Sequence, residues 1–213
     1  MTIDQLLDLG PVIPVVAIDD AERAVPLAHA LLEGGLRTIE VTLRTPAALD
    51  AIARIAGEVP AITVGAGTIV ADEQVEQARR VGARFLVSPG STPRVLAAMA
   101  AGGLPFLPGI ATPSELIALV ERGISCAKLF PTEAAGGIAM AQALAGPFPQ
   151  VRLCPTGGID AASAPDWLAL SNVACVGGTW LARGPLHNED DFARVTRLAR
   201  AAADLARPAA ATR

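Results

Sequence analysis

Short apolar runs alternate with amphipathic segments along the whole chain. Eight of these runs are typical of buried β-strands, since each is short, largely apolar and bounded by turn residues, and the run 38–43 is also rich in β-branched residues. They cover residues 12–18, 38–43, 61–64, 84–88, 104–107, 126–130, 151–154 and 173–176. A continuous apolar run is typical of a strand covered on both faces, which favours parallel pairing. The pattern therefore predicts a parallel sheet with helices outside it.

A helical pattern follows each strand, and several helices carry signals for their first residue. Thr2 to Gln5 reads as a capping box that opens a short leading helix. In three later helices a threonine suited to the N-cap precedes a proline suited to the first helical position. These pairs are Thr45-Pro46, Thr92-Pro93 and Thr112-Pro113. A final amphipathic helix is predicted over about 190–205.

Eight strands, each followed by a helix, predict an α/β fold. The favoured architecture is a single (β/α)8 TIM barrel with a short N-terminal helix, and a doubly wound open sheet is the alternative. No change in composition divides the chain, so we expect one domain over 1–205. The Ala/Pro/Arg-rich residues 206–213 are expected to form a frayed tail.

Composition excludes several classes of partner. The chain is 52% hydrophobic and 18% charged, with a net charge of −4 and no run of Lys or Arg, so no nucleic-acid surface is expected. Its longest apolar windows are broken by Gly and Pro, and its start lacks a signal-peptide pattern, so we expect no membrane partner. Three isolated cysteines favour buried free thiols and a cytoplasmic protein.

Lys128, the only lysine of the chain, lies in the apolar run 126–130. Strand alternation places its side chain on the same face as those of Cys126 and Phe130. Burial disfavours a charged ammonium and so favours the free amine, which can attack a carbonyl carbon and form a Schiff base. The alternative is a lysine at a strand end whose amine reaches water.

Polar residues also occur near the ends of other strands, where a barrel builds its active site. Glu40 lies within 38–43 and is the residue that could exchange protons with a Schiff base at Lys128. A purely structural ion pair is the alternative, although such pairs contribute little net stability. Three further residues follow strands in the same way: Arg44, Thr68 and Thr156.

Two glycine-rich turns follow the last two strands, at Gly157-Gly158 and Gly177-Gly178-Thr179. In barrels these loops often bind phosphate through backbone N–H groups, which glycine leaves accessible. No His, Cys, Asp or Glu cluster has metal-ligand spacing, and no dinucleotide fingerprint is present. The sequence therefore predicts a phosphate site and neither a metal nor an organic cofactor.

Seven sequence blocks together resemble one known family. They are GGLRTIEVTLRTP (34–46), GAGT (65–68), SPG (88–90), PGIATPSE (108–115), AKLFPTE (127–133), CPTGGI (154–159) and GGTWL (177–181). In this order they span nearly the whole chain. On these blocks the chain resembles the class I aldolases of the 2-keto-3-deoxy-6-phosphogluconate (KDPG) and 4-hydroxy-2-oxoglutarate (KHG) aldolase family.

The resemblance implies a role for each matching residue. Lys128 would form the Schiff base and Glu40 would be the general acid and base. Substrate contacts are implied at Arg44, Thr68, Pro89, Phe130 and Thr156. Phosphate contacts are implied at the two glycine pairs and the threonine after them: Gly157, Gly158, Gly177, Gly178 and Thr179. Three features depart from the family pattern: Thr132, where a smaller residue is common, Thr179, where a serine with the same hydroxyl function is common, and the loop 183–187.

The resemblance further implies the reaction and its setting. KDPG would be cleaved to pyruvate and glyceraldehyde 3-phosphate, with KHG as a second substrate, by a cytoplasmic homotrimer of the Entner–Doudoroff pathway. The alternatives are a 2-dehydro-3-deoxy-6-phosphogalactonate aldolase, a barrel sugar-phosphate isomerase or epimerase, and a non-catalytic barrel that binds a phosphorylated ligand. CPTGGI favours the gluconate branch, and the Lys128 and Glu40 combination argues against the last two.

Overall fold

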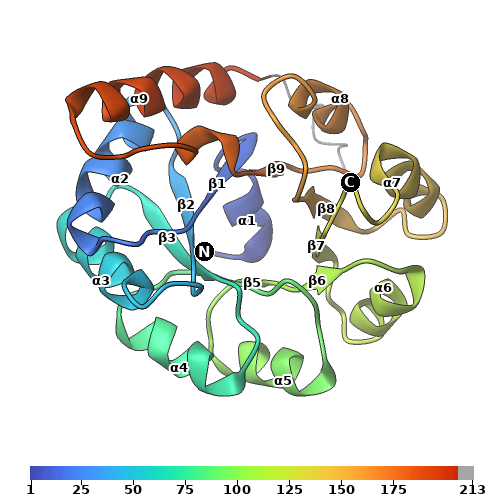
Figure 1. Ribbon diagram of the computed structural model, residues 1–213. Helices are drawn as coiled ribbons and strands as arrows, with labels where there is room; N and C mark the ends of the chain where they lie inside the picture. The colour runs from blue at the N-terminus through green and yellow to red at the C-terminus, as the bar shows by residue number, and fades with distance from the viewer. Residues whose placement is uncertain (206–213) are drawn as a thin grey trace.

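Strands alternate with helices throughout residues 1–205, the part of the chain that the computed structural model describes (Figure 1). The strands are β1 Val12–Val16, β2 Thr38–Thr42, β3 Thr63–Gly67, β4 Leu86–Val87, β5 Phe106–Leu107, β6 Gly109–Ile110, β7 Cys126–Leu129, β8 Arg152–Pro155 and β9 Val176–Gly178. The α-helices are α1 Ile3–Leu7, α2 Ala24–Glu33, α3 Ala48–Glu58, α4 Asp72–Arg80, α5 Pro93–Ala101, α6 Pro113–Val120, α7 Gly137–Ala145, α8 Ala164–Leu168 and α9 Glu189–Ala203. There are also two 3₁₀ helices: η1 Ala21–Arg23 precedes α2, and η2 Trp180–Ala182 follows β9.

Strand pairing is parallel and divides into two sheets. The larger has the order β5-β4-β3-β2-β1-β9 and the smaller the order β6-β7-β8. The predicted strand 104–107 continues beyond Pro108 as a second short strand, so β5 pairs with β4 while β6 pairs with β7. Pro108 has no N–H to donate, which suits the point where the segment changes partners. The parallel α/β fold is confirmed, and a closed eight-stranded ring stays a prediction.

Alternation along the strands separates two apolar clusters. Ile39, Val41, Ala127 and Leu129 belong to the larger cluster, which the strands share with the surrounding helices. The smaller cluster lies on the opposite strand faces and joins strand residues to α1: Leu6, Leu7, Ile13, Phe85, Val87, Leu107, Cys126, Cys154, Ala174 and Cys175. In Figure 1, α1 lies among the strands, whereas α2 to α9 surround them.

Helix α1 covers the ends at which the strands begin. Arg152, the first residue of β8, donates to Asp4 at 2.9 Å and to Asp8 at 2.6 Å, and both acceptors belong to α1 or its C-cap. The predicted capping box of Thr2 and Gln5 opens this helix. One end of the strands is therefore covered, which leaves the carboxyl ends for a binding site.

Of the three predicted helix starts with a Thr-Pro pair, two are correct and one is wrong. Thr92 and Thr112 cap α5 and α6, each followed by proline, as predicted. Helix α3 begins only at Ala48, because the Thr45 hydroxyl donates to the carbonyl oxygen of Ile18 instead of capping a helix. A tertiary hydrogen bond thus overrides the local signal.

The remaining predictions about the chain concern its cysteines, its C-terminal tail and the absence of a membrane-spanning helix. All three cysteines are buried, as predicted. Among residues 1–205 no helix is long and apolar enough to cross a bilayer. The predicted tail, 206–213, lies outside the described residues.

Candidate active site

Lys128 and Glu40 form a buried ion pair between β7 and β2. Lys128 Nζ lies 3.1 Å from Glu40 Oε1 and 3.4 Å from Oε2. The two residues are only 5% and 3% exposed. Charged side chains are rarely buried this fully unless they are paired. The prediction that these two residues meet, although they are 88 positions apart, is confirmed.

The neighbouring strands are shaped to admit the carboxylate. Ile39 and Val41 face the helices, so Glu40 between them faces the space enclosed by the strands. Opposite, at the end of β3, a Cβ atom on Gly67 would collide with the Glu40 carboxylate. Glycine at this position is therefore a steric requirement of the buried acid.

Phe130 lies beside the amine, and Thr156 follows the strand next to that of Lys128. The ring centroid of Phe130 is 5.5 Å from Lys128 Nζ, a distance typical of a cation–π contact. Thr156 is 3% exposed and directly follows β8, the strand that pairs with β7 at Lys128. Both residues thus border the Lys128 side of the site.

Thr132 is a buried residue with a structural role that was not predicted from the sequence. Its hydroxyl donates to the Leu129 carbonyl at 2.6 Å and accepts from the Thr156 N–H at 2.9 Å. Its own N–H donates to the Thr156 carbonyl at 2.9 Å. These bonds fasten the carboxyl end of β7 to that of β8. The signal was available, because a threonine replacing a smaller family residue next to Phe130-Pro131 must satisfy its hydroxyl where it is buried.

Arg44, Thr68 and Pro89 follow the carboxyl ends of β2, β3 and β4, as predicted. The exposed Arg44 donates from Nε to the Thr42 hydroxyl at 3.1 Å. Thr68 has a φ of 63°, a left-handed value that is uncommon for a residue other than glycine. Within the described part of the chain, none of these three residues forms a hydrogen bond with Lys128 or Glu40. Their relation to the ion pair is that they follow strand ends at the same edge of the sheet.

The two glycine segments lie next to each other, although Gly177 and Gly178 are the last residues of β9, paired with β1, and not a turn after the strand as predicted. A parallel bridge joins Thr156 to Gly177, and the N–H of Glu133 donates to the carbonyl of Gly157 at 3.2 Å. Gly157 and Gly158 have φ values of 103° and 90°, which glycine adopts without strain. The predicted phosphate turns are therefore brought together at the ends of β8 and β9.

Packing gives a second reason for three of these glycines. A Cβ atom at Gly177 would overlap Thr156, one at Gly178 would overlap the Trp180 ring, and one at Gly158 would overlap the Glu133 stem. The glycines therefore admit neighbouring side chains as well as leaving backbone N–H groups accessible. Thr179 accepts a hydrogen bond from Arg183 at 3.1 Å.

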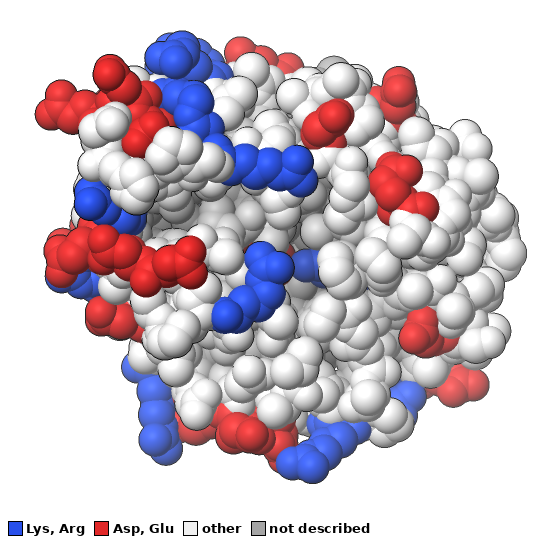
Figure 2. Space-filling model, in the orientation of Figure 1, with Lys and Arg blue, Asp and Glu red and all other residues white. Residues whose placement is uncertain are grey.

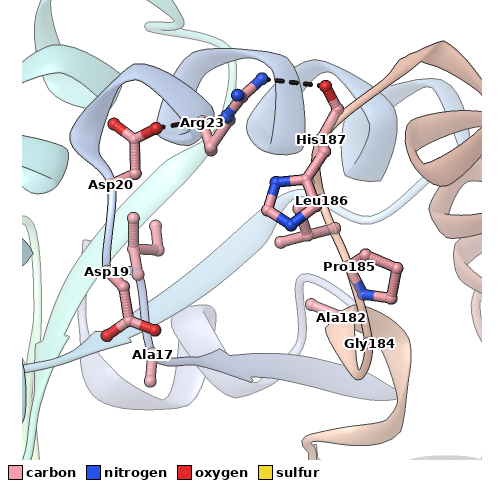
Figure 3. A pocket seen from close by; sticks show the side chains of 10 residues that line it. Ala17, Asp19, Asp20, Arg23, Ala182, Gly184, Pro185, Leu186 and His187 are labelled. Atoms are coloured by element: carbon pink, nitrogen blue, oxygen red, sulfur yellow. Dashed lines mark hydrogen bonds and ion pairs between the residues drawn. The ribbon is translucent and has the colours of Figure 1, made fainter.

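A separate hollow of about 260 Å³ lies between the β1–α2 segment and the loop after η2 (Figure 3). Its lining includes Asp19, Asp20, Arg23 and His187 but neither Lys128 nor Glu40. We therefore assign it no part in the chemistry of the ion pair. The face drawn in Figure 2 is hollowed near its centre, and basic side chains border that hollow.

The donor set does not suit a metal ion. Within residues 1–205 no three His, Cys, Asp or Glu side chains lie close enough together to hold one. Cys126 is no candidate nucleophile either, because burial, reinforced by the charge of Asp4, raises the pKa of its thiol to about 12. The nucleophile that the geometry favours is the Lys128 amine, with the Glu40 carboxylate within proton-transfer distance.

Comparison with known proteins gives a consistent result. A family model described as KDPG and KHG aldolase matches residues 3–198. The KHG/KDPG aldolase of Escherichia coli (strain K12) is 48% identical over 201 residues, which are 94% of this chain and 94% of that relative.

Solved structures agree with the sequence matches. A 2-keto-3-deoxy-6-phosphogluconate aldolase of Zymomonas mobilis ZM4, solved with 3-phosphoglycerate, has a TM-score of 0.92 and 42% identity, covering 98% of both chains. A KDPG aldolase of Legionella pneumophila, with pyruvate captured at low pH as a covalent carbinolamine intermediate, has a TM-score of 0.92 and 40% identity. That match covers 96% of this chain and 99% of the other.

Proposed function

This chain belongs to the KDPG and KHG aldolase family, and from that membership and the buried Lys128–Glu40 pair we propose a specific reaction. The protein is a class I aldolase, a lyase that cleaves KDPG to pyruvate and glyceraldehyde 3-phosphate. It also acts on KHG. Family membership over nearly the full chain disfavours an isomerase, an epimerase or a non-catalytic binding barrel.

The observation that carries the proposal is the position of Lys128. A carbinolamine with pyruvate, as captured in the Legionella relative, forms when an amine adds to the C2 carbonyl. Lys128 is the only lysine of this chain, and its amine is buried beside a carboxylate. No other side chain of the protein offers a primary amine.

The first half of the reaction uses both members of the pair. Lys128 Nζ attacks the C2 ketone, and the resulting carbinolamine loses water to give an iminium. Glu40 is close enough to Nζ to exchange the protons that these steps require. The positive iminium then accepts the electron pair of the C3–C4 bond.

The second half releases both products. Glu40 takes the proton of the C4 hydroxyl as the C3–C4 bond breaks, and glyceraldehyde 3-phosphate leaves. The remaining enamine is protonated at C3, and water hydrolyses the iminium to pyruvate and the free amine. Proton transfer by a positioned carboxylate is worth about 10²–10⁴-fold in rate.

The other predicted residues bind the substrate in this proposal. Arg44 and Thr68 hold the carboxylate of the pyruvate half, Phe130 and Pro89 pack against the carbon chain, and Thr156 contacts a substrate hydroxyl. The support is their position at the carboxyl ends of β2, β3, β4, β7 and β8. The N–H groups of both glycine turns and the Thr179 hydroxyl bind the phosphate: Gly157, Gly158, Gly177, Gly178 and Thr179.

The larger assembly is also a proposal. Bridges from Leu153 of β8 to Val173 and from Thr156, which follows β8, to Gly177 support a closed (β/α)8 barrel that forms one domain over 1–205. The continuity of β5 with β6 supports it as well. A homotrimer, a cytoplasmic location and a place in the Entner–Doudoroff pathway remain predictions from the family resemblance.

A coupled assay tests the proposed reaction. Purified protein should release pyruvate from KDPG, and at a measurable rate from KHG, with lactate dehydrogenase and NADH reporting pyruvate. Turnover should persist after dialysis against EDTA, because the iminium supplies the electron sink that a metal would otherwise provide. Failure to release pyruvate from either substrate would refute the proposal, and metal-restored activity would refute the class I mechanism.

A further inference from the structure

We propose that Arg183 determines specificity for the phosphorylated substrate, by binding the phosphate that the two glycine turns enclose. The proposal rests on the proposed aldolase function and adds a residue to its anion site. Arg183 belongs to the loop 183–187, which departs from the family pattern. It would make the site prefer a dianionic phosphate over a substrate tail without that charge.

Arg183 contacts one glycine segment and lies within electrostatic range of the other. Its Nη2 donates to Thr179 Oγ1 at 3.1 Å, which places the guanidinium at the residue after β9. The segment after β8 is followed by Asp160, two residues beyond Gly158. Hydrogen bonds from Ser163 hold the pKa of Asp160 below its ordinary value, and the positive charge of Arg183 contributes to the shift. One cation therefore acts on both turns.

The hydrogen bond to Thr179 orients a second anion donor. A hydroxyl group has one proton to donate and lone pairs that can accept. Because Thr179 Oγ1 accepts from Arg183, its own proton remains free for a phosphate oxygen. The guanidinium keeps further N–H groups for the same ligand, and planar bidentate binding of phosphate is typical of arginine.

Charge balance favours such a cation. The stem of Glu133 packs against Gly158, and Asp160 follows the same turn, so a phosphate there would lie near two carboxylates. Backbone N–H groups supply only partial charges. A full positive charge at Arg183 offsets this repulsion, which a dianion would otherwise experience most strongly.

The loop that carries Arg183 is held in place at several points. Arg23 donates from Nη1 to the carbonyl of His187 at 3.1 Å, and Arg194 donates from Nη2 to the carbonyl of Pro185 at 3.1 Å. Figure 3 shows the first of these bonds across the hollow between the two segments. A cation on an anchored loop loses little conformational freedom when the anion binds, which strengthens binding.

The test compares Arg183→Gln with wild type on two substrates that differ only in phosphate: KDPG and 2-keto-3-deoxygluconate. The kcat/KM for KDPG should fall by about 10- to 100-fold, the range for losing a hydrogen bond to a charged group. The fall for the unphosphorylated substrate should be at least about tenfold smaller. Inorganic phosphate, used as a competitive inhibitor, should need a correspondingly higher concentration.

Arg80→Gln is the control for net charge. Arg80 is an exposed residue of α4, with its side chain 74% exposed and paired with Glu76. It should not change the preference between the two substrates. Equal losses on both substrates in Arg183→Gln, or unchanged inhibition by phosphate, would overturn the proposal for Arg183. Wild type that traps no pyruvate on Lys128 would instead overturn the proposed function itself.

Discussion

Cys126 and Lys128 lie two residues apart on the same face of β7, yet their surroundings differ completely. Cys126 belongs to the small apolar cluster that α1 covers, and its Sγ lies 3.5 Å from Asp4 Oδ1. Lys128 faces the Glu40 carboxylate, with Phe130 directly after β7 and Thr156 directly after the neighbouring β8. One strand face thus contributes a thiol to packing and an amine to a polar site.

The difference shows how the fold divides its tasks. At the end covered by α1, buried apolar side chains stabilise the protein, and burial keeps the Cys126 thiol protonated. At the other end, two charged groups are buried together at a cost in desolvation that stability alone does not justify. We expect substitutions to separate accordingly: the α1 end should govern unfolding and the Lys128 end should govern catalysis.

The sharpest separation is expected from the double variant Lys128→Met/Glu40→Leu. Cleavage should fall by about 10⁴-fold or more, because no amine remains to form a Schiff base. The free energy of unfolding should equal or exceed that of wild type, since apolar replacements of a buried ion pair are often neutral or stabilising by about 1–4 kcal/mol. Urea denaturation and the coupled assay measure both quantities.

Lys128→Met alone serves as the matched control for stability. It leaves Glu40 buried without a partner, so it should be about 3–5 kcal/mol less stable than wild type. A double variant that still cleaved KDPG would place the chemistry elsewhere. A double variant that was as unstable as the single one would mean that the pair holds the strands together.

Glu40→Gln should be the next largest effect. The amide keeps the size of the side chain but cannot take a proton, so kcat for cleavage should fall by about 10²–10⁴-fold. Exchange of the pyruvate methyl protons with deuterated water, followed by NMR, should slow in parallel because it requires the same shuttle. A kcat within a fewfold of wild type would leave Glu40 only a structural partner of Lys128.

Leu6→Ala tests the other end. Leu6 is 1% exposed in the cluster beneath β7, so its truncation should lower the free energy of unfolding by about 2–5 kcal/mol. The kcat should stay within roughly twofold, because distant independent sites affect each other little. Loss of catalysis in the remaining folded fraction would show that the two ends are coupled.

The Cys126 thiol should have no effect on stability at neutral pH and should show its effect only in alkali. Its pKa is raised from 9.0 to about 12, so the native thiol stays protonated where the unfolded one ionises. Stability is fully present below pH 9 and declines as the pH rises toward 12, by at most about 1.4 kcal/mol per unit. Cys126→Ala should flatten this decline, measured by denaturation at several pH values.

Alkylation gives an independent check on the same thiol. Iodoacetamide at pH 8 should label Cys126 in urea but not in the native protein, because thiolate is the reactive form and the side chain is buried. Rapid native labelling, located by mass spectrometry, would contradict the assignment of Cys126 to the inert end.

Much of this division could be predicted from the sequence. Apolar runs located most of the strands, although the run 173–176 meets β9 only at Val176, and strand alternation grouped the side chains that share a face with Lys128 and with Glu40. These predictions succeeded because they depend on local periodicity. The ion pair between Lys128 of β7 and Glu40 of β2 could be expected because the carboxyl ends of parallel strands meet at one edge of the sheet.

Features that depend on distant contacts were missed. Thr45 bonds to Ile18 rather than capping α3, and the segment around Pro108 divides between two sheets. The glycines at 177 and 178 admit Thr156 and Trp180, which sequence alone did not indicate. The same applies to Arg183, because its position next to Thr179 follows from a loop fastened by residues of η1 and α9.

Reductive trapping of pyruvate tests the central claim most directly. Protein treated with pyruvate and sodium borohydride should gain the mass of one pyruvate-derived adduct, and peptide mapping should locate it on Lys128. Lys128→Met should gain none, which excludes the N-terminal amine as the site. An adduct on the N-terminus, or no adduct in wild type, would contradict the account that the buried amine of β7 is the nucleophile.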